Sequence, residues 1–389
     1  MPDPNPASSL RVLALEPWFG GSHKRFLESW AARSVHQVEL LGLPPRHWRW
    51  RMTAGAWALA ERVRRDGLPR PDVLFVSDYV DLPRLYGHLP RDWRSLPALL
   101  YFHENQLTYP AAEGLEGAAA QFAEDVTPGM TNLLSCLAAE RVLFNSEYHR
   151  ADFAAAGDAL LARLPKPRPR QQVKAVLEAA QVVAPGIDLA ELPLGPGAPA
   201  GAPLRVGFNH RWEHDKDPVG FLRAAKEAIA AGADLELVLL GERYERTPPE
   251  VDALLAGLGS RVLHTGFAED RAEYARLLGS CDLVASCAQH EFYGMAILEG
   301  LAVGAHPLAP HKLSYPHVLP RNLHERGLFT DHADCVARLV RASREPAPLR
   351  DPAFREHLST SIREHDSDAT AAALDRACSG YGAALDSSG

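Results

Sequence analysis

The sequence contains few cysteines, and none of them form a close pair. Its five cysteines are scattered over 389 residues, without the short spacings that zinc sites and thioredoxin-like motifs require. An odd number of widely spaced cysteines favours reduced thiols in a cytoplasmic protein. Because no run of about 18 apolar residues occurs, no membrane-spanning helix is expected. The polar, proline-rich start MPDPNPASS lacks the apolar stretch of a signal peptide.

Basic residues are also outnumbered, because 41 Lys+Arg stand against 49 Asp+Glu and the formal net charge is −8. Spread evenly, this charge would argue against a polyanionic partner. Residues 1–200 carry 21 Lys+Arg against 22 Asp+Glu, whereas the remaining residues carry 20 against 27. Almost all of the acidity therefore lies in the second half, and the distribution leaves room for a basic face on the first half.

Short apolar runs alternate with helical patterns along the first half of the chain. Apolar residues make up 46% of the sequence, enough to fill two ordinary cores. Buried-type strands that alternate with helices predict an α/β fold, with a parallel sheet covered on both faces. We therefore expect a Rossmann-like, doubly wound domain over residues 1–195. Its expected strands span residues 10–15, 38–41, 72–77, 98–102, 141–146 and 182–183, with helices at residues 54–65 and 131–139.

The same pattern restarts after a Gly/Pro/Ala-rich linker at residues 195–203. A second Rossmann-like domain is therefore expected over residues 204–350, followed by a helical tail at residues 351–389. The basic stretch RLPKPRPR at residues 163–170 breaks helix propensity and predicts a mobile loop. The expected strands of the second domain span residues 204–209, 235–240, 262–265 and 282–285, with helices at residues 219–230 and 296–303.

Two carboxylates, Glu291 and Glu299, stand eight residues apart around the predicted start of a helix. They share a face of that helix only if Glu291 sits just outside it. Free N–H groups of Tyr293, Gly294 and Met295 at the helix start would attract a phosphate. Glu291 would then accept hydrogen bonds from sugar hydroxyls, and Glu299 from a ribose diol. Taken alone, the spacing also fits two ordinary surface carboxylates on an amphipathic helix.

Cationic side chains follow the first strand of the second domain. Asn209, Arg211 and Lys216 lie in the loop at the carboxyl end of that strand, where open α/β sheets bind ligands. A guanidinium and an ammonium there would neutralise a diphosphate, although this segment alone fits a solvated mixed-charge loop equally well. Backbone at Gly266 and Phe267 is expected to contact the base of a nucleotide.

The first domain offers a glycine turn and a polar cluster at its strand ends. Gly20, Gly21 and Ser22 follow the first strand and would let the backbone approach a ligand closely. This turn is not the G-x-G-x-x-G fingerprint, which disfavours a nicotinamide or flavin enzyme. His103 directly follows a buried strand. A lone histidine is more often structural than catalytic, but the adjoining polar residues favour a site here: Glu104, Asn105 and Gln106.

Together these features resemble the retaining glycosyltransferases of family 4, whose GT-B fold has two Rossmann-like domains facing across a cleft. The resemblance implies that Arg211 and Lys216 bind the diphosphate of a sugar nucleotide, and that His103 and Glu291 are the catalytic residues. No metal or other cofactor is expected, because the positive pair and a helix dipole stabilise the departing diphosphate. The resemblance also implies these donor-binding residues: Gly20, Gly21, Ser22, Asn209, Gly266, Phe267, Tyr293, Gly294, Met295 and Glu299.

Three segments of the first half are more particular than family 4 requires. They are LEPWFGGSHK (15–24), PPRHWRWRM (44–52) and HENQLTYP (103–110). Together they resemble the tRNA-queuosine mannosyltransferase family. The resemblance implies GDP-mannose as the donor and the cyclopentenediol of queuosine in tRNA-Asp as the acceptor.

Residues 44–70 carry seven arginines against two acids, with three tryptophans interleaved. Arginines neutralise backbone phosphates, and aromatic rings stack on exposed anticodon-loop bases. Residues 49–51 are expected in a loop, where we favour contact with tRNA, whereas Trp57 is expected to pack on the core. The expected acceptor-binding and tRNA-binding residues are His23, Lys24, Arg46, Trp48, Arg49, Trp50, Arg51, Glu104, Asn105 and Gln106.

Two other functions fit parts of the sequence. A family 4 enzyme acting on a lipid, a small metabolite or a glycan would use an exposed basic-apolar helix, for which residues 54–65 are a candidate. A non-catalytic nucleotide-binding or RNA-binding protein could keep the same scaffold. The joint presence of the two carboxylates, Glu291 and Glu299, with Arg211 and Lys216 argues against such a protein. No protein partner is evident from the sequence.

Overall fold

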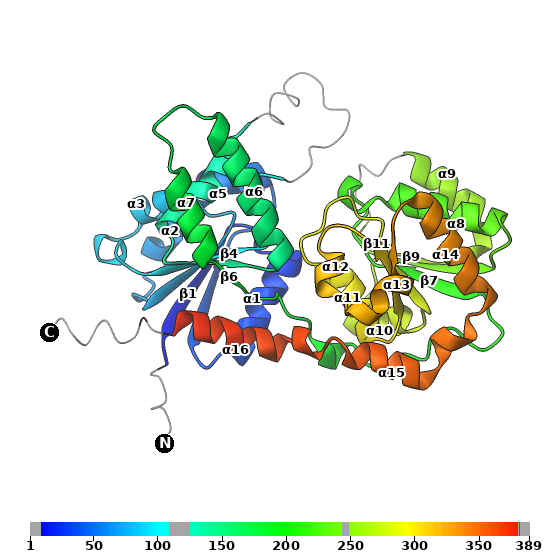
Figure 1. The fold of residues 1–389 in the computed structure, drawn as a ribbon. Helices are drawn as coiled ribbons and strands as arrows, with labels where there is room; N and C mark the ends of the chain where they lie inside the picture. The colour runs from blue at the N-terminus through cyan, green and yellow to red at the C-terminus, as the bar shows by residue number, and fades with distance from the viewer. Residues whose placement is uncertain (1–8, 109–124, 243–248, 380, 382–389) are drawn as a thin grey trace. The chain divides into compact units, whose positions relative to one another are not determined.

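The computed structural model describes residues 9–108, 125–242, 249–379 and 381. The chain consists of two compact units (Figure 1). Unit 1 comprises residues 1–186 and 367–389, and unit 2 comprises residues 187–366. Each unit is built on one six-stranded sheet, so the expected α/β fold with two doubly wound sheets is confirmed. No helix of the described residues is long and apolar enough to cross a membrane.

All strands of unit 1 run parallel, in the order β2-β1-β3-β4-β5-β6. Each expected strand is present, because short runs of buried apolar residues specify the strands of a sheet that is covered on both faces. The strands are β1 (Arg11–Glu16), β2 (Gln37–Gly42), β3 (Val73–Ser77), β4 (Ala98–Phe102), β5 (Arg141–Phe144) and β6 (Gln181–Val182).

Alternate residues of each strand feed two separate cores. Val12 and Ala14 point to one face, and Leu13 and Leu15 point to the other, as the period of two along a strand requires. The first face is covered by α1 (Gly21–Arg33) and α16 (Ser367–Cys378). The second face is covered by α2 (Trp48–Arg65), α3 (Leu82–His88), α5 (Thr127–Ala138), α6 (Glu147–Arg163) and α7 (Arg170–Ala179).

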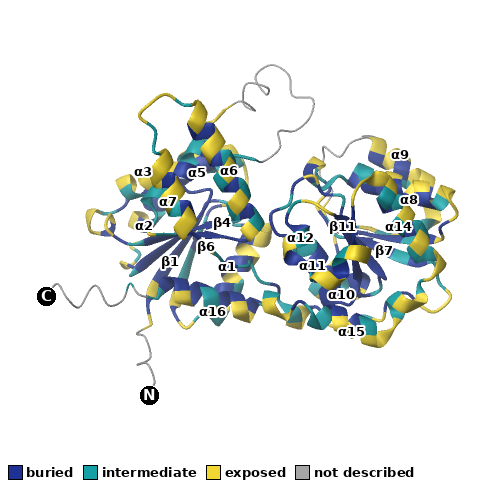
Figure 2. Cartoon of the chain, viewed as in Figure 1, coloured by how far each residue is buried: buried dark blue, intermediate teal, exposed yellow. Residues whose placement is uncertain are grey.

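The sheet of unit 2 is also parallel, in the order β12-β11-β10-β7-β8-β9. Its strands are buried, apart from the partly exposed edge strand at Val262–Gly266, whereas the outer faces of its helices are exposed (Figure 2). The strands are β7 (Leu204–Phe208), β8 (Leu235–Leu240), β9 (Val262–Gly266), β10 (Leu283–Ala285), β11 (His306–Pro310) and β12 (Leu328–Phe329). The helices are α8 (Pro218–Ala230), α9 (Pro249–Leu258), α10 (Arg271–Gly279), α11 (Met295–Ala302), α12 (Tyr315–Val318), α13 (His324–Gly327), α14 (His332–Arg344) and α15 (Pro352–Thr360).

The boundary between the units lies at residue 186 rather than at the expected residue 195. The Gly/Pro-rich segment that follows residue 194 packs on unit 2, where the N–H of Gly195 donates to Val303 O at 3.0 Å. A Cβ atom on Gly195 would lie only 2.3 Å from the backbone of Gly279. Glycine is therefore needed for close backbone packing, and this segment is not a free linker.

The C-terminal tail is divided between the two units instead of forming a part of its own. The first of its helices, α15, belongs to unit 2, where the buried Arg355 donates to four backbone carbonyls. The second, α16, belongs to unit 1. There Asp375 accepts hydrogen bonds from Trp30 Nε1 at 2.9 Å, from the Ser34 hydroxyl at 2.6 Å and from the Val35 N–H at 2.9 Å.

Candidate functional site

The predicted donor residues of unit 2 meet at the carboxyl ends of β7 and β10, which are neighbours in the sheet. Lys216 follows β7, and its Nζ lies 3.2 Å from Glu291 Oε2 and 3.1 Å from Asp215 Oδ2. The same Nζ donates to the carbonyl oxygen of His290 at 2.9 Å. Two residues that stand 75 positions apart in the sequence therefore form a buried ion pair at the edge where α/β sheets bind ligands.

The charges around this ion pair keep both of its partners ionised in spite of their burial. Burial alone would raise the pKa of Glu291, but Lys216, His210 and the N–H of Tyr293 lower it to about 2. Burial alone would lower the pKa of Lys216, but Glu291 and Asp215 raise it. Burial, followed by the charge of Lys216, lowers the pKa of His210 to about 4. Glu291 is therefore a permanently charged hydrogen-bond acceptor and not a proton donor.

Helix α11 begins directly after this ion pair. Its N-cap, Gly294, has a φ of 99° and ψ of 33°, and a Cβ there would lie 3.1 Å from the ring of Tyr315, so glycine fits best. The N–H of Tyr293 was expected to be free for a phosphate, but it donates to Glu291 Oε1 at 3.2 Å. That expectation is wrong for Tyr293, because the carboxylate itself caps the turn. Gly294 and Met295 stand at the start of the helix, as expected.

The second carboxylate, Glu299, belongs to a separate hydrogen-bond network on the same helix. Its Oε1 accepts from Arg271 Nη2 at 2.7 Å, and its Oε2 accepts from the hydroxyl of Tyr274. Asn209 Nδ2 donates to that hydroxyl at 2.8 Å and to Ala296 O at 2.9 Å. Burial and the neighbouring Glu299 raise the pKa of Tyr274 well above its usual value. A ribose diol would therefore reach Glu299 by replacing one of these protein partners.

Three other predicted donor residues lie in exposed loops of unit 2 or at the strand end that adjoins one. Arg211 is half-exposed and forms an ion pair with Glu213 at 3.0 Å. Gly266 ends β9 with a φ of 112°, and the adjoining Phe267 exposes 78% of its surface.

A glycine turn joins β1 to α1 in unit 1. A Cβ atom on Gly20 would lie 2.4 Å from the side chain of Pro45, and Gly21 has a φ of 53°. Both positions therefore favour glycine for reasons of packing and backbone conformation. Ser22 is exposed in the first turn of α1. The turn ends at the N-terminus of a helix, which is a suitable place for an anion.

The predicted catalytic His103 lies in a buried polar cluster at the carboxyl ends of β1, β3 and β4. Its backbone N–H donates to Asp78 Oδ1 at 2.9 Å. Its ring stacks on the ring of His23, with centroids 3.9 Å apart and planes 28° apart. His23 Nδ1 lies 3.1 Å from Glu16 Oε2. His23, which was expected to contact tRNA, is only 8% exposed and supports His103 instead.

Three ligand-type atoms of Glu16, His23 and His103 lie within 4.8 Å of one another. A metal ion lies in the plane of each imidazole that binds it, because the nitrogen lone pair lies in that plane. Two nearly parallel rings stacked 3.9 Å apart cannot both meet this condition. The arrangement therefore fits an ion pair and a ring stack better than it fits a metal site.

The residues after His103 shape the loop rather than forming an open polar surface. Glu104 accepts a hydrogen bond from the hydroxyl of Tyr79. Asn105 is fully buried, and its Oδ1 accepts from the Leu107 N–H at 3.0 Å. The backbone N–H of Gln106 donates to a side chain of α5. Asn105, predicted to bind the acceptor, holds this turn through its Oδ1, while its buried Nδ2 has no hydrogen-bond partner among the described residues.

Helix α2 carries four of the ten predicted acceptor-binding and tRNA-binding residues, Trp48, Arg49, Trp50 and Arg51. It begins at Trp48, so the expectation that residues 49–51 lie in a loop is wrong. His47, with a φ of 55°, ends the preceding loop, and the guanidinium of Arg49 lies 4.9 Å from the ring centre of Trp48. Trp57 was expected to pack on the core, but it is 52% exposed.

The remaining predicted acceptor residues lie on the surface of unit 1. Arg46 is exposed in the loop before α2. The ammonium of Lys24 in α1 lies 3.6 Å from Glu28. Tyr109 and Pro110, which end the third particular segment of the sequence, lie outside the described residues.

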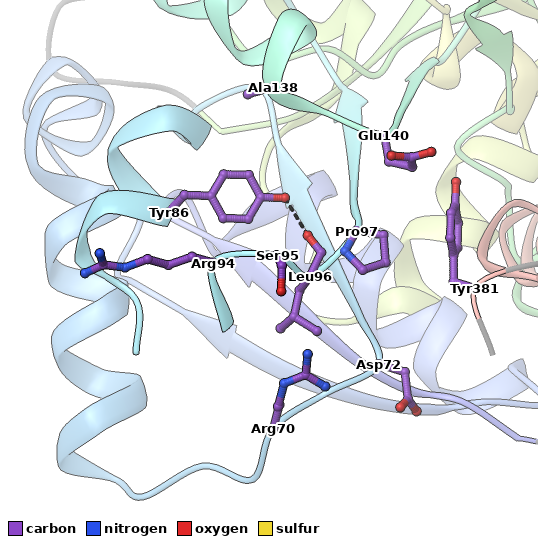
Figure 3. A pocket seen from close by; sticks show the side chains of 10 residues that line it. All are labelled: Arg70, Asp72, Tyr86, Arg94, Ser95, Leu96, Pro97, Ala138, Glu140 and Tyr381. Carbon is purple, nitrogen blue, oxygen red and sulfur yellow. Dashed lines mark hydrogen bonds between the residues drawn. The ribbon is translucent and has the colours of Figure 1, made fainter. Parts of the chain in front are cut away.

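A cavity of about 470 Å³ opens at the opposite, amino-terminal edge of the sheet of unit 1 (Figure 3). Its arginines are engaged by protein carbonyls, since Arg70 donates to Asp92 O and Arg94 donates to Leu89 O. Tyr86 donates to Leu96 O at 2.7 Å. Ligands of open α/β sheets bind at the carboxyl ends of the strands, so this cavity is not the candidate site.

Comparison with known proteins also divides the chain into two parts, close to the boundary between the two units. Residues 11–187 match the family described as tRNA-queuosine alpha-mannosyltransferase N-terminal, and residues 198–345 match glycosyl transferases group 1. A tRNA-queuosine alpha-mannosyltransferase of Drosophila melanogaster is 32% identical over 319 residues, which cover 80% of this chain and 82% of that protein. The chain belongs to the tRNA-queuosine alpha-mannosyltransferase family.

Solved structures of other glycosyltransferases share the GT-B fold of this family member. The Anabaena protein HepE in complex with UDP and glucose is 15% identical, with a TM-score of 0.67 over 95% of this chain and 99% of that one. Sucrose-phosphate synthase from Thermosynechococcus elongatus is 17% identical, with a TM-score of 0.68 over 96% and 100%. At these identities the likeness shows the fold alone, while the family membership makes the chain a glycosyltransferase.

Sequence reasoning missed several residues that this glycosyltransferase places in its candidate sites. Glu16 and Asp78 are charged residues at the ends of buried strands, and that position was a usable signal. Asp215 adjoins Lys216 and could have been found in the same way. No pattern in the sequence pointed to Arg271 and Tyr274, because their partner Glu299 is reached only through the fold.

The substitution Lys216→Met tests the ion pair between Lys216 and Glu291 in unit 2. Two buried carboxylates would lose their cation, so we expect the free energy of unfolding at about pH 7 to fall by about 3–5 kcal/mol. The pKa of Glu291 is lowered from 4.5 to about 2 in the wild type. The ionised carboxylate of Glu291 therefore stabilises the wild type at pH values above the unfolded-state pKa of this group. That stabilisation is lost as the pH falls toward 2.

The deficit of Lys216→Met should therefore shrink as the pH falls through this interval, which urea unfolding at several pH values would measure. Arg341→Ala, on an exposed face of α14, is the control and should match the wild type at each pH. A deficit independent of pH would contradict the assigned ion pair.

Proposed function

We propose that the protein transfers mannose from GDP-mannose to the cyclopentenediol of queuosine in tRNA-Asp, with retention of configuration and without a metal ion. The observation that carries this proposal is the 32% identity to a tRNA-queuosine alpha-mannosyltransferase over 80% of the chain. A tRNA substrate is consistent with a cytoplasmic enzyme. The sugar nucleotide is the small-molecule partner, and the tRNA is the macromolecular one.

The charged groups of unit 2 support a metal-independent donor site. Lys216 is held beside Glu291 by a buried ion pair, and Arg211 lies in the same loop after β7. Two cations and the N-terminus of α11 would stabilise the negative charge that develops on the departing diphosphate. Glu291, ionised at every physiological pH, would accept hydrogen bonds from the mannose hydroxyls.

The proposed reaction needs no covalent enzyme intermediate. The bond between mannose C1 and the diphosphate oxygen breaks while a queuosine hydroxyl oxygen bonds to C1 on the same face. The departing diphosphate takes the proton of that hydroxyl. His103 would then position and stabilise the reacting sugar, and no protein base is required.

One exposed face of α2 supports an RNA acceptor. Trp50 and Trp57, seven residues apart, are 60% and 52% exposed, and a seven-residue spacing places them on the same side of the helix, about 10 Å apart. Arg64 continues the same face and is exposed. Gly55 packs on Pro17, where a Cβ would lie 3.0 Å away. Gly55 is on the buried side of α2, so this contact places the helix, with its tryptophan face outward, against the loop that follows β1 and carries the glycine turn.

The decisive test is to incubate the protein with GDP-mannose and tRNA-Asp, with or without queuosine, and to weigh the nucleosides by mass spectrometry. We expect a gain of one hexose on queuosine and none on tRNA that lacks it, with the same yield in EDTA. UDP-glucose in place of GDP-mannose is the donor control. Absence of hexose on queuosine, or transfer to a lipid or free glycan instead, would refute the acceptor assignment.

Substitutions at Glu291, His103 and Glu299 should separate effects on catalysis from effects on nucleotide binding. Glu291→Ala and His103→Ala should each lower kcat by about 100-fold or more, because each removes a group at the reacting sugar. Glu299→Ala should mainly weaken GDP binding, by about 10–100-fold, as loss of a charged hydrogen bond does. Calorimetric titration with GDP measures the weaker GDP binding of Glu299→Ala. Near-wild-type transfer by Glu291→Ala would remove the donor assignment.

Substitution of the exposed tryptophans should weaken tRNA binding without changing the donor site. Trp50→Ala and Trp57→Ala should each raise the Kd for tRNA about 10-fold, because stacking on one base is worth about 1–3 kcal/mol. Filter binding at several salt concentrations measures this effect, with the Kd for GDP as an internal control. Val35→Ala removes another exposed apolar side chain of unit 1 and should change neither constant. An unchanged tRNA affinity in both tryptophan variants would exclude this face.

A further inference from the structure

The buried polar cluster behind His103 is more elaborate than a single catalytic histidine requires. Glu16 is the last residue of β1, Asp78 directly follows β3, and His103 directly follows β4. These three strands are neighbours in the sheet, so their carboxyl ends adjoin. His23 joins the cluster from the first turn of α1.

Glu16 is fixed in place by several donors. It is 1% exposed, and its Oε1 accepts from the Trp18 N–H at 2.7 Å and from the Ser77 hydroxyl at 3.0 Å. Its Oε2 faces His23 Nδ1 at 3.1 Å. A buried carboxylate with this many donors is held in one orientation and fixes its partner at a defined position.

The ring of His103 is held by packing rather than by hydrogen bonds. His23 stacks on its face at 3.9 Å, Phe26 stands edge-on at 4.9 Å and 90°, and Tyr101 stands edge-on at 4.7 Å and 60°. His103 Nε2 is buried and has no hydrogen-bond partner among the described residues. Buried polar atoms normally find a partner, so this nitrogen is suited to a substrate hydroxyl.

The charges around the two rings place a proton on His23 in preference to His103. Burial, then the nearby charge of His23 and of His149 on α6, lowers the pKa of His103 well below its usual value. Burial alone would also lower the pKa of His23, but the carboxylates facing it raise it. These facing groups come from the ends of three strands: Glu16 after β1, Asp78 after β3 and Glu104 after β4.

We propose that Glu16 and His23 form a fixed ion pair that holds the ring of His103 and keeps it uncharged at the reacting sugar. This inference rests on the proposed function, because His103 is placed at the sugar only there. Glycosyl transfer builds positive charge on the sugar ring, which an imidazolium at His103 would oppose. A neutral imidazole hydrogen-bonds a hydroxyl without that repulsion. Glu16 and His23 are positioning residues, and only His103 touches the substrate.

Two variants test the ion pair. His23→Phe keeps a stacked ring but removes the titratable group, and Glu16→Gln removes the carboxylate that raises the pKa of His23. Both should raise the titration midpoint of His103 by about one pH unit, because a nearby positive charge has been removed. The midpoint is measured by NMR of ring-labelled histidines in the full chain, with the His103 signal identified by its loss in His103→Gln. His88→Gln, on the exposed end of α3, is the control and should leave the midpoint unchanged.

The acid limb of the kcat–pH profile should move to higher pH by the same amount in both variants. If His23→Phe does not fold, because Glu16 is then buried without a cation, the double variant Glu16→Gln/His23→Phe removes both charges and carries the same expectation. An unmoved His103 midpoint would overturn the proposal, even if kcat falls. The NMR titration needs no substrate, so a failure to transfer mannose would refute the proposed function without affecting this result.

Discussion

Parallel strands end at one edge of their sheet, and both candidate sites depend on this constraint. In unit 2 the ends of β7 and β10 bring Lys216 to Glu291. In unit 1 the ends of β1, β3 and β4 bring Glu16, Asp78 and His103 together. The strands themselves are buried on both faces and carry almost no polar side chains, so the first residue that can hold a charge is the one at or just after the strand end.

Charges that are buried at such an edge need partners, and the kind of partner decides the chemistry. Lys216 and Glu291 hold each other ionised, which makes unit 2 suited to binding a sugar and a diphosphate but not to moving protons. Glu16 pairs with a histidine instead, and imidazole titrates near neutral pH. Paired buried charges therefore give unit 2 a site whose charges stay constant near neutral pH, and they give unit 1 a site that contains a titratable group.

The strands and the loops after them could be predicted, because runs of buried apolar residues specify them directly. Two strands of unit 2 were not anticipated: β11 (His306–Pro310), since its two prolines are unusual within a sheet, and β12 (Leu328–Phe329), which is only two residues long. The start of α2 was missed because Arg, Trp and Met at residues 48–52 read as a charged loop, although all are compatible with a helix. The partners of Glu299 could not be predicted, because they come from a helix that the fold alone brings near.

The exposed tryptophans of α2 also change how the net charge should be read. A net charge of −8 by itself disfavours binding RNA, yet a charge acts on a phosphate mainly within a Debye length, about 8 Å at physiological ionic strength. The balance that matters is therefore local, and residues 44–70 carry seven arginines against two acids. Trp50 and Trp57 expose apolar surface on this same helix, which folding alone does not favour. Stacking on unpaired bases would remove that surface from water, so the aromatic and cationic features of α2 have one common explanation in an RNA acceptor.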